Sequence, residues 1–287
     1  MPDRSDERPR VAVTGVTGAV GRMTADALAD AGVPFRMLAR SPERAPRFPG
    51  SSVARASYGD EEAALAALDG VETLLMVSAA ENAERLREHV AFVDAAARAG
   101  VGHIVYTSFF RAAPDATFTL ARDHHATEQR ILASGMRHTF LRDNLYLDFA
   151  RNLVGDDGVI RGPAGDGRAA MVARADVARV AAEVLLHPDD HVDVTYDLTG
   201  PSDLTLAEVA ETLSAHSGRA VSFHDETVPE AYASRAGWRA PDWQVDAWVS
   251  TYTAIAAGEL AGPTDAVERI TGRRPLSLDE FLRDALG

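Results

Sequence analysis

The feature that most constrains this chain is a strand, a glycine-rich turn and a helix near its start. Residues 11–22 read VAVTGVTGAVGR, so small and β-branched residues lead into Gly15, Gly18 and Gly21, and the helical run MTADALADAG follows. In such a unit the first glycine permits a tight turn, the second lets the backbone approach a pyrophosphate, and the third lets helix and strand pack closely. The helix N-terminus adds free N–H groups and a positive dipole end. The sequence therefore predicts a dinucleotide-binding turn, against the alternative of a glycine-rich turn without a ligand.

Beyond this unit, short apolar runs alternate with helical patterns. The pattern predicts strands at 33–40, 52–60, 71–80, 101–110 and 136–142, and helices at 61–70, 81–100 and 118–135. Strands that alternate with helices in this way form a parallel sheet covered on both faces. Right-handed crossovers make that sheet doubly wound.

The rhythm loosens after about residue 150. A turn-rich stretch at 155–169 precedes a predicted helix at 174–188, a strand at 194–200 and a helix at 204–218. We therefore expect an α/β protein with a doubly wound parallel (Rossmann) sheet and a smaller C-terminal α/β lobe. In residue numbers, we expect 8–153 plus about 174–200 to form the dinucleotide-binding domain, and about 154–173 plus 201–287 to form the substrate-binding lobe.

Composition excludes several classes of function. The formal net charge is −14 and no basic stripe is visible, which argues against a nucleic-acid partner. No apolar run reaches the ~18 residues of a membrane span, and the first residues lack the apolar core of a signal peptide. Cysteine is absent, and all 29 basic residues are arginine, so neither a thiolate nor a lysine ammonium can take part in the chemistry. We expect a cytoplasmic protein without a metal, a nucleic-acid partner or a membrane partner, and a homo-oligomer is possible.

The residue that ends the second predicted strand bears on cofactor choice. In the NAD-binding version of this fold, an acidic residue about 20 positions after the glycines binds the ribose hydroxyls. Here Arg40 stands 19 residues after Gly21 and is followed by Ser41. A guanidinium suits a 2′-phosphate, to which it can make paired charge-assisted hydrogen bonds. The sequence therefore favours NADPH over NADH, against the alternative of a solvated loop arginine.

Other polar or small residues end the next three strands. Asp60 follows the third strand, where it could accept a hydrogen bond from the adenine amino group, cap the following helix, or do both. Ser78 and Ala79 end the fourth strand, and their small side chains would let the nicotinamide ribose approach. Thr107 and Ser108 end the fifth strand. Their hydroxyls either face the nicotinamide or have no role beyond strand termination. Ligands of open α/β sheets bind at these carboxyl ends.

Two adjacent histidines stand on the next predicted helix. His124 and His125 diverge by about 100°, so only one of them can face the cofactor. This spacing does not suit a shared metal ion.

Three segments of the chain resemble the NmrA-like, atypical short-chain dehydrogenase/reductase family, and within it the quinone oxidoreductase and triphenylmethane reductase type. TGVTGAVGR matches the TGATG-x-x-G start of that family. HHATEQRILASGMRHTFLRDNLYLDF is similar to its helix, strand and loop, and DAWVSTYTAIAAGELAGPTDAVERITGRRPLSLDEFL is similar to its C-terminal tail. The resemblance covers nearly the whole chain and implies a reductase that uses a dinucleotide.

The chain departs from the wider superfamily at the catalytic pair Tyr-x-x-x-Lys. No tyrosine here has a lysine four residues on, and Leu120 and His124 stand at the expected place. The resemblance implies that His124 occupies the position of that lysine, or of the residue that the quinone reductases have in its place. It also places Asp143 where the family often has proline, ahead of Asn144.

The expected site consists of cofactor-binding, catalytic and substrate-pocket residues. The cofactor-binding residues are Gly15, Thr17, Gly18, Ala19, Val20, Gly21, Arg40, Ser41, Asp60, Ser78, Ala79, Thr107 and His124. The catalytic residues are His124, Ser108 and Tyr146, and the substrate pocket includes Phe109, Asn144 and Tyr146.

Three functions agree with these residues. The first is an NADPH-dependent reductase that passes hydride to a quinone-like or other conjugated aromatic acceptor, a reaction in which orientation supplies most of the rate without a Tyr-Lys pair. The second is a biosynthetic reductase of a polycyclic ketone or enone, which needs a proton donor. The third is a non-catalytic NAD(P)-sensing regulator, which would also lack the pair.

Overall fold

A parallel sheet forms the centre of the fold. The structure is a computed structural model and describes residues 9–284, within which the main sheet has seven strands. Their order across the sheet is β3 (Ser52–Arg55), β2 (Phe35–Ala39), β1 (Val11–Val13), β4 (Thr73–Met76), β5 (His103–Phe109), β6 (Arg137–Asp143) and β9 (Val194–Leu198). β1 pairs in parallel with both β2 and β4. The strand order therefore reverses beside β1, which is the switch point where such sheets bind ligands. The predicted doubly wound fold is confirmed.

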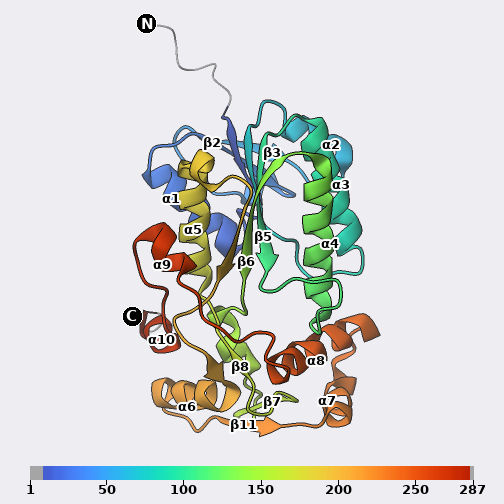
Figure 1. Cartoon of the computed structure of the whole chain (residues 1–287), viewed down its shortest axis with the longest axis vertical. Helices are drawn as coiled ribbons and strands as arrows, with labels where there is room; N and C mark the ends of the chain where they lie inside the picture. The colour runs from blue at the N-terminus through green and yellow to red at the C-terminus, as the bar shows by residue number, and fades with distance from the viewer. Residues whose placement is uncertain (1–8, 285–287) are drawn as a thin grey trace, which may run out of the picture. The chain divides into compact units, whose positions relative to one another are not determined.

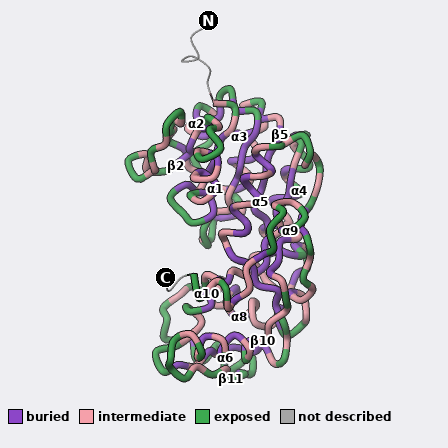
Figure 2. The backbone as a smooth tube through the Cα atoms, turned by 90° about the vertical axis from the view of Figure 1, so that its left-hand side faces the viewer, coloured by how far each residue is buried: buried purple, intermediate pink, exposed green. Residues whose placement is uncertain are grey.

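Helices cover both faces of this sheet. They are α1 (Ala19–Asp30), α2 (Glu61–Ala67), α3 (Arg85–Arg98), α4 (Thr119–Ser134) and α5 (Arg174–Leu186). Figure 1 shows α1 and α5 along one face and α2, α3 and α4 along the other. Because both faces are covered, every residue of β4 and β5 is buried. Figure 2 shows buried backbone in the middle of this part of the chain. This burial explains why both strands read as continuous apolar runs in the sequence.

The described residues divide into two compact units. The first comprises residues 9–108, 126–141 and 178–196, and the second comprises 109–125, 142–177 and 197–284. Each unit has its own cluster of buried apolar side chains. The predicted boundaries between a dinucleotide-binding domain and a substrate-binding lobe stay a prediction.

The second unit contains two small sheets and several helices. Its strands are β7 (Val159–Gly162), β8 (Arg168–Ala169), β10 (Leu204–Thr205) and β11 (Ser222–Asp225), and its helices are α6 (Leu206–Ser217), α7 (Val228–Arg235), α8 (Asp242–Ala256), α9 (Ala266–Thr271) and α10 (Leu278–Asp284). β11 pairs with β7 in parallel, and β10 pairs with β8 antiparallel. A capping box begins α6, in which Thr205 Oγ1 accepts from the Glu208 amide and the Glu208 carboxylate accepts from the Thr205 amide.

A buried ion pair holds part of this second unit together. Arg235, at the end of α7, donates to Glu226 Oε2 over 2.9 Å, and both side chains are only 4% exposed. A second guanidinium nitrogen donates to the carbonyl oxygen of Arg161 over 2.9 Å. The guanidinium also lies 5.6 Å from the ring centre of Trp238 and 5.2 Å from that of Tyr252. These contacts satisfy a charge that would otherwise be unfavourable in an apolar interior.

Within residues 9–284, no helix combines the length and the apolar character that crossing a bilayer requires. The cytoplasmic location stays a prediction.

Candidate functional site

The glycine-rich turn forms an open loop between β1 and α1. Gly15 has a φ of +66°, a conformation that favours glycine. The Gly18 amide donates to the Gly15 carbonyl over 2.8 Å, and α1 begins at Ala19 without a side-chain cap. Thr17, Gly18 and Ala19 are exposed, whereas Val20 is buried in the core. The exposed turn can therefore offer backbone N–H groups to an anion.

The three glycines of this turn differ in how much room they leave. A Cβ atom on Gly21 would lie 2.4 Å from the carbonyl oxygen of Thr14, so no side chain fits between α1 and β1. A Cβ atom on Gly18 would come no closer than 3.4 Å to the Gly15 carbonyl oxygen. Gly21 is thus required by packing inside the protein, whereas the protein itself leaves space at Gly18.

Arg40 and Asp60 lie just after β2 and before α2. The Arg40 side chain is exposed and has no hydrogen-bond or ion-pair partner among residues 9–284. Ser41 follows it at the start of a short 3₁₀ turn, Pro42–Arg44, and makes no side-chain cap there. Asp60 Oδ1 accepts from the Ala63 amide over 3.0 Å, which confirms its role as the cap of α2. Its adenine role stays a prediction.

Side chains fix the loop that follows β4. The Ser78 amide donates to Thr107 Oγ1 over 2.8 Å, so the threonine hydroxyl at the end of β5 supports the neighbouring loop. The Ala79 amide donates to His89 Nε2 over 2.9 Å, and Arg85 Nε donates to the Ala79 carbonyl over 3.0 Å. Both predicted cofactor residues of this loop, Ser78 and Ala79, are therefore held by hydrogen bonds from outside it.

The protonation of His89 follows from these contacts. Burial, with the charge of Arg85 as the second cause, lowers the pKa of His89 to about 3. The ring is neutral at pH 7, and its Nε2 accepts from Ala79, so its proton lies on Nδ1 and is donated to Thr127 Oγ1 over 3.0 Å. Sequence reasoning missed His89 because a histidine on an amphipathic helix carries no sign of a tertiary contact.

A second buried contact joins the end of β5 to α4. Ser108 Oγ donates to Glu128 Oε1 over 2.6 Å, and both side chains are buried. Sequence reasoning selected Ser108 but missed Glu128. A signal was present, since Glu128 follows His124 by four residues and the two share one face of α4.

In the second unit, the ring of Phe109 lies between those of Phe118 and His124 in a chain of ring contacts. The ring centroid of Phe109 lies 4.8 Å from that of Phe118 and 6.0 Å from that of the imidazole of His124. His124 is 6% exposed, whereas His125 is only partly buried. The two histidines therefore have different environments, and the roles of His124 and Phe109 stay predictions.

Asn144 contacts the backbone of the second unit. Its Nδ2 donates to the Leu260 carbonyl over 2.9 Å, and its Oδ1 accepts from the Leu145 amide over 2.8 Å. Both amide atoms thus already have partners, and Asn144 braces the segment after β6. Its place in the substrate pocket stays a prediction.

Tyr146 forms a pair with Asp143. The phenol donates to Asp143 Oδ2 over 2.7 Å, and the guanidinium carbon of Arg174 lies 4.9 Å from the tyrosine ring centre. Burial raises the pKa of Asp143 to about 8, although the hydrogen bond from Tyr146 opposes the shift. Asp143 is therefore largely protonated at pH 7.

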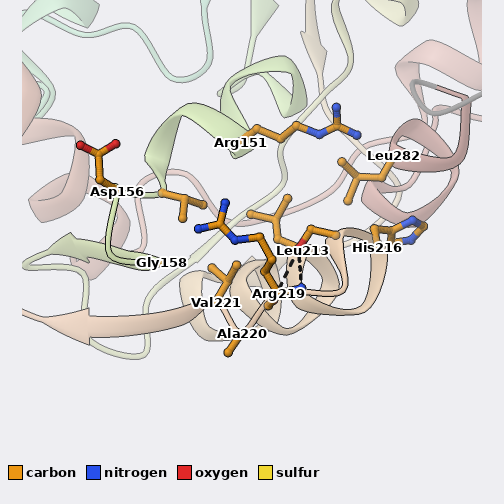
Figure 3. A pocket seen from close by; sticks show the side chains of 12 residues that line it. Arg151, Asp156, Gly158, Leu213, His216, Arg219, Ala220, Val221 and Leu282 are labelled. Atoms are coloured by element: carbon orange, nitrogen blue, oxygen red, sulfur yellow. Dashed lines mark hydrogen bonds between the residues drawn. The ribbon is translucent and has the colours of Figure 1, made fainter.

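A cavity of about 480 Å³ opens elsewhere in the second unit, and Figure 3 shows its lining. Arg151, Asp156 and Arg219 line it together with the apolar side chains of Leu213 and Leu282. None of the predicted site residues contributes to this lining.

Comparison with known proteins agrees with this geometry. The model of a family described as NAD(P)H-binding matches residues 15–188. A solved structure of an NADPH-dependent quinone oxidoreductase from Escherichia coli in complex with NADPH is 31% identical, with a TM-score of 0.87 over 96% of this chain and 100% of that chain. A triphenylmethane reductase from Citrobacter sp. in complex with NADP(H) is 30% identical, with a TM-score of 0.83 over 96% of this chain and 99% of that chain.

A third relative comes from Streptomyces griseus. This (4-alkanoyl-5-oxo-2,5-dihydrofuran-3-yl)methyl phosphate reductase is 35% identical over 268 residues, which are 92% of this chain and 93% of the relative. The family match spans more than half of the chain, and the resemblance inferred from the sequence is confirmed. The chain belongs to the NAD(P)H-binding family, in the branch of the NmrA-like atypical short-chain dehydrogenase/reductases.

Proposed function

We propose that this protein is an NADPH-dependent reductase that transfers hydride to a quinone-like or other conjugated aromatic acceptor without a Tyr-Lys pair. The observation that carries the proposal is the open glycine turn, where Gly15 turns the chain and α1 begins without a side-chain cap. The quinone oxidoreductase and triphenylmethane reductase relatives support this acceptor class.

The residues present fit NADPH. The turn offers exposed backbone at Gly18 for the pyrophosphate, and the unpartnered guanidinium of Arg40 offers a counter-charge for the 2′-phosphate. Ser78 and Ala79 stand at the carboxyl edge of the sheet, where the loop after β4 is held by His89 and Thr107. NADPH supplies hydride when bound, and the protein positions it.

The protein's own residues must orient the acceptor and donate one proton to it. Phe118, which is only partly buried and packs against the buried ring of Phe109, offers an aromatic face against which a flat acceptor can stack. A conjugated acceptor stabilises the charge that it receives, so positioning supplies most of the rate. Proton donation is assigned to Tyr146, His124 or Ser108. The Tyr146 hydroxyl already donates to Asp143, and the Ser108 hydroxyl to Glu128.

A second candidate is a biosynthetic reductase of an enone. The observation that favours it is the Streptomyces griseus relative, whose printed substrate contains a 5-oxo-2,5-dihydrofuran ring. The third alternative is a regulator that binds the dinucleotide without turnover. Measuring NADPH oxidation distinguishes it from both reductases.

The test is NADPH oxidation with three acceptors: a naphthoquinone, a cyclic enone and a saturated ketone of similar size. We expect the quinone to give the highest kcat/KM and the saturated ketone to give none above background. Preferential reduction of the enone would establish the second candidate. Tight NADPH binding by calorimetry without turnover of any acceptor would contradict both reductases.

The charge at position 40 should decide the cofactor. We expect Arg40→Asp to weaken NADPH binding by about 1.5–3 kcal/mol, the scale of hydrogen bonds to charged groups, and to leave NADH binding almost unchanged. Calorimetric titration of both cofactors measures the effect. Arg10→Asp is the matched control, because Arg10 makes an exposed ion pair with Glu72 at the opposite edge of the sheet and its substitution changes the net charge equally. Equal losses in the two variants would contradict the assignment.

A further inference from the structure

Asp143 is a buried carboxyl group that contacts the hydroxyl of Tyr146. Asp143 is 2% exposed, and its Oδ2 accepts the phenolic hydrogen bond of Tyr146 over 2.7 Å. Its other oxygen, Oδ1, is buried and has no hydrogen-bond partner among residues 9–284. Buried carboxyl oxygens are normally paired, so an orphaned oxygen calls for a functional explanation.

The charges around the pair are few. Arg174 stacks over Tyr146 at 4.9 Å and over Phe149 at 4.2 Å, and its backbone amide donates to Asp148 Oδ2 over 3.0 Å. None of these contacts reaches Asp143 itself, which has no cationic partner among the described residues. The carboxyl group is therefore most stable in its neutral form, and it holds a proton at pH 7.

The phenol beside it also stays protonated. Burial, the charge on Asp143 and the hydrogen bond to it all raise the pKa of Tyr146 well above its usual value, while Arg174 opposes the shift. With its pKa raised in this way, Tyr146 cannot give up its proton and remain a phenolate at pH 7. It can donate its proton only if it receives another one at the same time, and Asp143 is the neighbour that holds one.

The position of the pair suits proton delivery. Asp143 is the last residue of β6 and Tyr146 follows three residues later, so both stand at the carboxyl edge of the sheet, where ligands bind in this fold. Tyr146 is only partly buried, whereas Asp143 is almost completely buried. The tyrosine can therefore contact an acceptor that the carboxyl group cannot reach.

We propose that Asp143 stores the proton of this reductase and delivers it through the Tyr146 hydroxyl to the oxygen of the reduced acceptor. The inference rests on the proposed function. Reduction of a quinone to a hydroquinone adds one hydride, which carries two electrons, and one proton. After hydride transfer the acceptor is an oxyanion. In the neutral pair, the 2.7 Å contact between Asp143 Oδ2 and the tyrosine oxygen can also form with the carboxyl O–H as the donor, which leaves the phenolic hydrogen free to point at the acceptor. The O–H bond of Tyr146 breaks as a new O–H bond forms on the oxyanion, and the O–H bond of Asp143 breaks as its proton passes to the tyrosine oxygen. Water then reprotonates the Asp143 carboxylate.

Two acceptors that differ in whether they need a proton distinguish this relay from a structural role of the pair. A triarylmethyl cation takes up hydride and needs no proton, whereas a naphthoquinone needs both. We expect Asp143→Asn and Tyr146→Phe each to lower kcat for the quinone at least 10-fold more than kcat for the cation, within the range of general acid catalysis. Asp156 is an exposed carboxylate of the same unit, and Asp156→Asn should affect kcat equally for both acceptors. Equal losses with both acceptors in the Asp143 and Tyr146 variants would overturn the relay.

The pH dependence gives a second readout. Asp143 is protonated below about pH 8 and loses its proton above it, so wild-type kcat for the quinone should fall as pH rises through that range. In Asp143→Asn this falling limb should disappear, because an amide does not titrate. A falling limb that persists unchanged in Asp143→Asn would contradict the assignment. This measurement needs only the quinone, so it holds even where the cation is not reduced.

A measurement without turnover separates failure of the relay from failure of the proposed function. Infrared difference spectroscopy of the protein alone should show a protonated carboxyl band at pH 7 that is lost in Asp143→Asn and titrates near pH 8. If the band is present and neither acceptor is reduced, the proposed function fails and the relay fails with it, while the proton store remains. If the band is absent, the relay fails whatever the acceptor.

Discussion

Replacing Gly18 with valine should abolish NADPH binding and leave the fold intact. The backbone at Gly18 is extended, with φ −102° and ψ 177°, which valine adopts readily, and a Cβ atom there meets nothing closer than the Gly15 carbonyl oxygen at 3.4 Å. The side chain would instead occupy the space in which a pyrophosphate approaches the turn. We expect the Kd for NADPH to rise at least about 100-fold, equivalent to about 2.7 kcal/mol, with an unchanged Tm. Calorimetric titration and thermal denaturation measure the two quantities.

Gly21→Ala is the matched comparison for this prediction. Its Cβ atom would lie 2.4 Å from the Thr14 carbonyl oxygen, so the helix or the strand must move. We expect that variant to lose thermal stability and cofactor binding together. Wild-type NADPH affinity in Gly18→Val would refute the placement of the pyrophosphate.

The second large effect should come from the buried ion pair of the second unit. Arg235→Met leaves Glu226 without its guanidinium partner in a site where both side chains are 4% exposed. Breaking a buried pair by removing one partner typically destabilises a protein by about 3–5 kcal/mol, because an uncompensated charge remains. We expect a loss of that size in the free energy of unfolding, measured by urea denaturation.

Two further variants show whether the stranded charge is the cause. The double variant Arg235→Met with Glu226→Leu removes both charges and should recover most of the lost stability. Arg161→Met breaks the exposed pair with Asp157 and should reduce stability much less than Arg235→Met does, because solvent screens exposed pairs. A double variant as unstable as the single one would show that the lost packing against Trp238 and Tyr252 matters more.

The sequence was sufficient to predict the sheet because its signals are local. Apolar strands such as β4 and β5 are continuous and bounded by turns, and Thr205 and Glu208 stand at the spacing of a capping box whose bonds form within one helical turn. Two-residue strands such as β8 and β10 have no such signal. They pair across more than 30 residues of chain, and their register depends on the fold around them.

The contacts of the candidate site were harder to predict. The pairs Ser108–Glu128 and Ala79–His89 join different elements, and each requires that a polar residue of an amphipathic helix be buried. Such a residue looks the same in the sequence whether it faces solvent or a neighbouring strand. The environment of Asp143 depends in the same way on burial, since only the removal of water makes its carboxyl group neutral.

The hydrogen bonds that hold Ala79 affect the thermodynamics of cofactor binding. His89 and Arg85 satisfy the amide and the carbonyl of Ala79 in the protein alone, so hydrogen bonds already hold the backbone of the loop after β4 at this residue before a cofactor arrives. Ordering a flexible residue costs about 1–2 kcal/mol of backbone entropy. Folding has already met that cost for this loop, so in the proposed site a larger part of the energy of the contact with the cofactor appears as affinity.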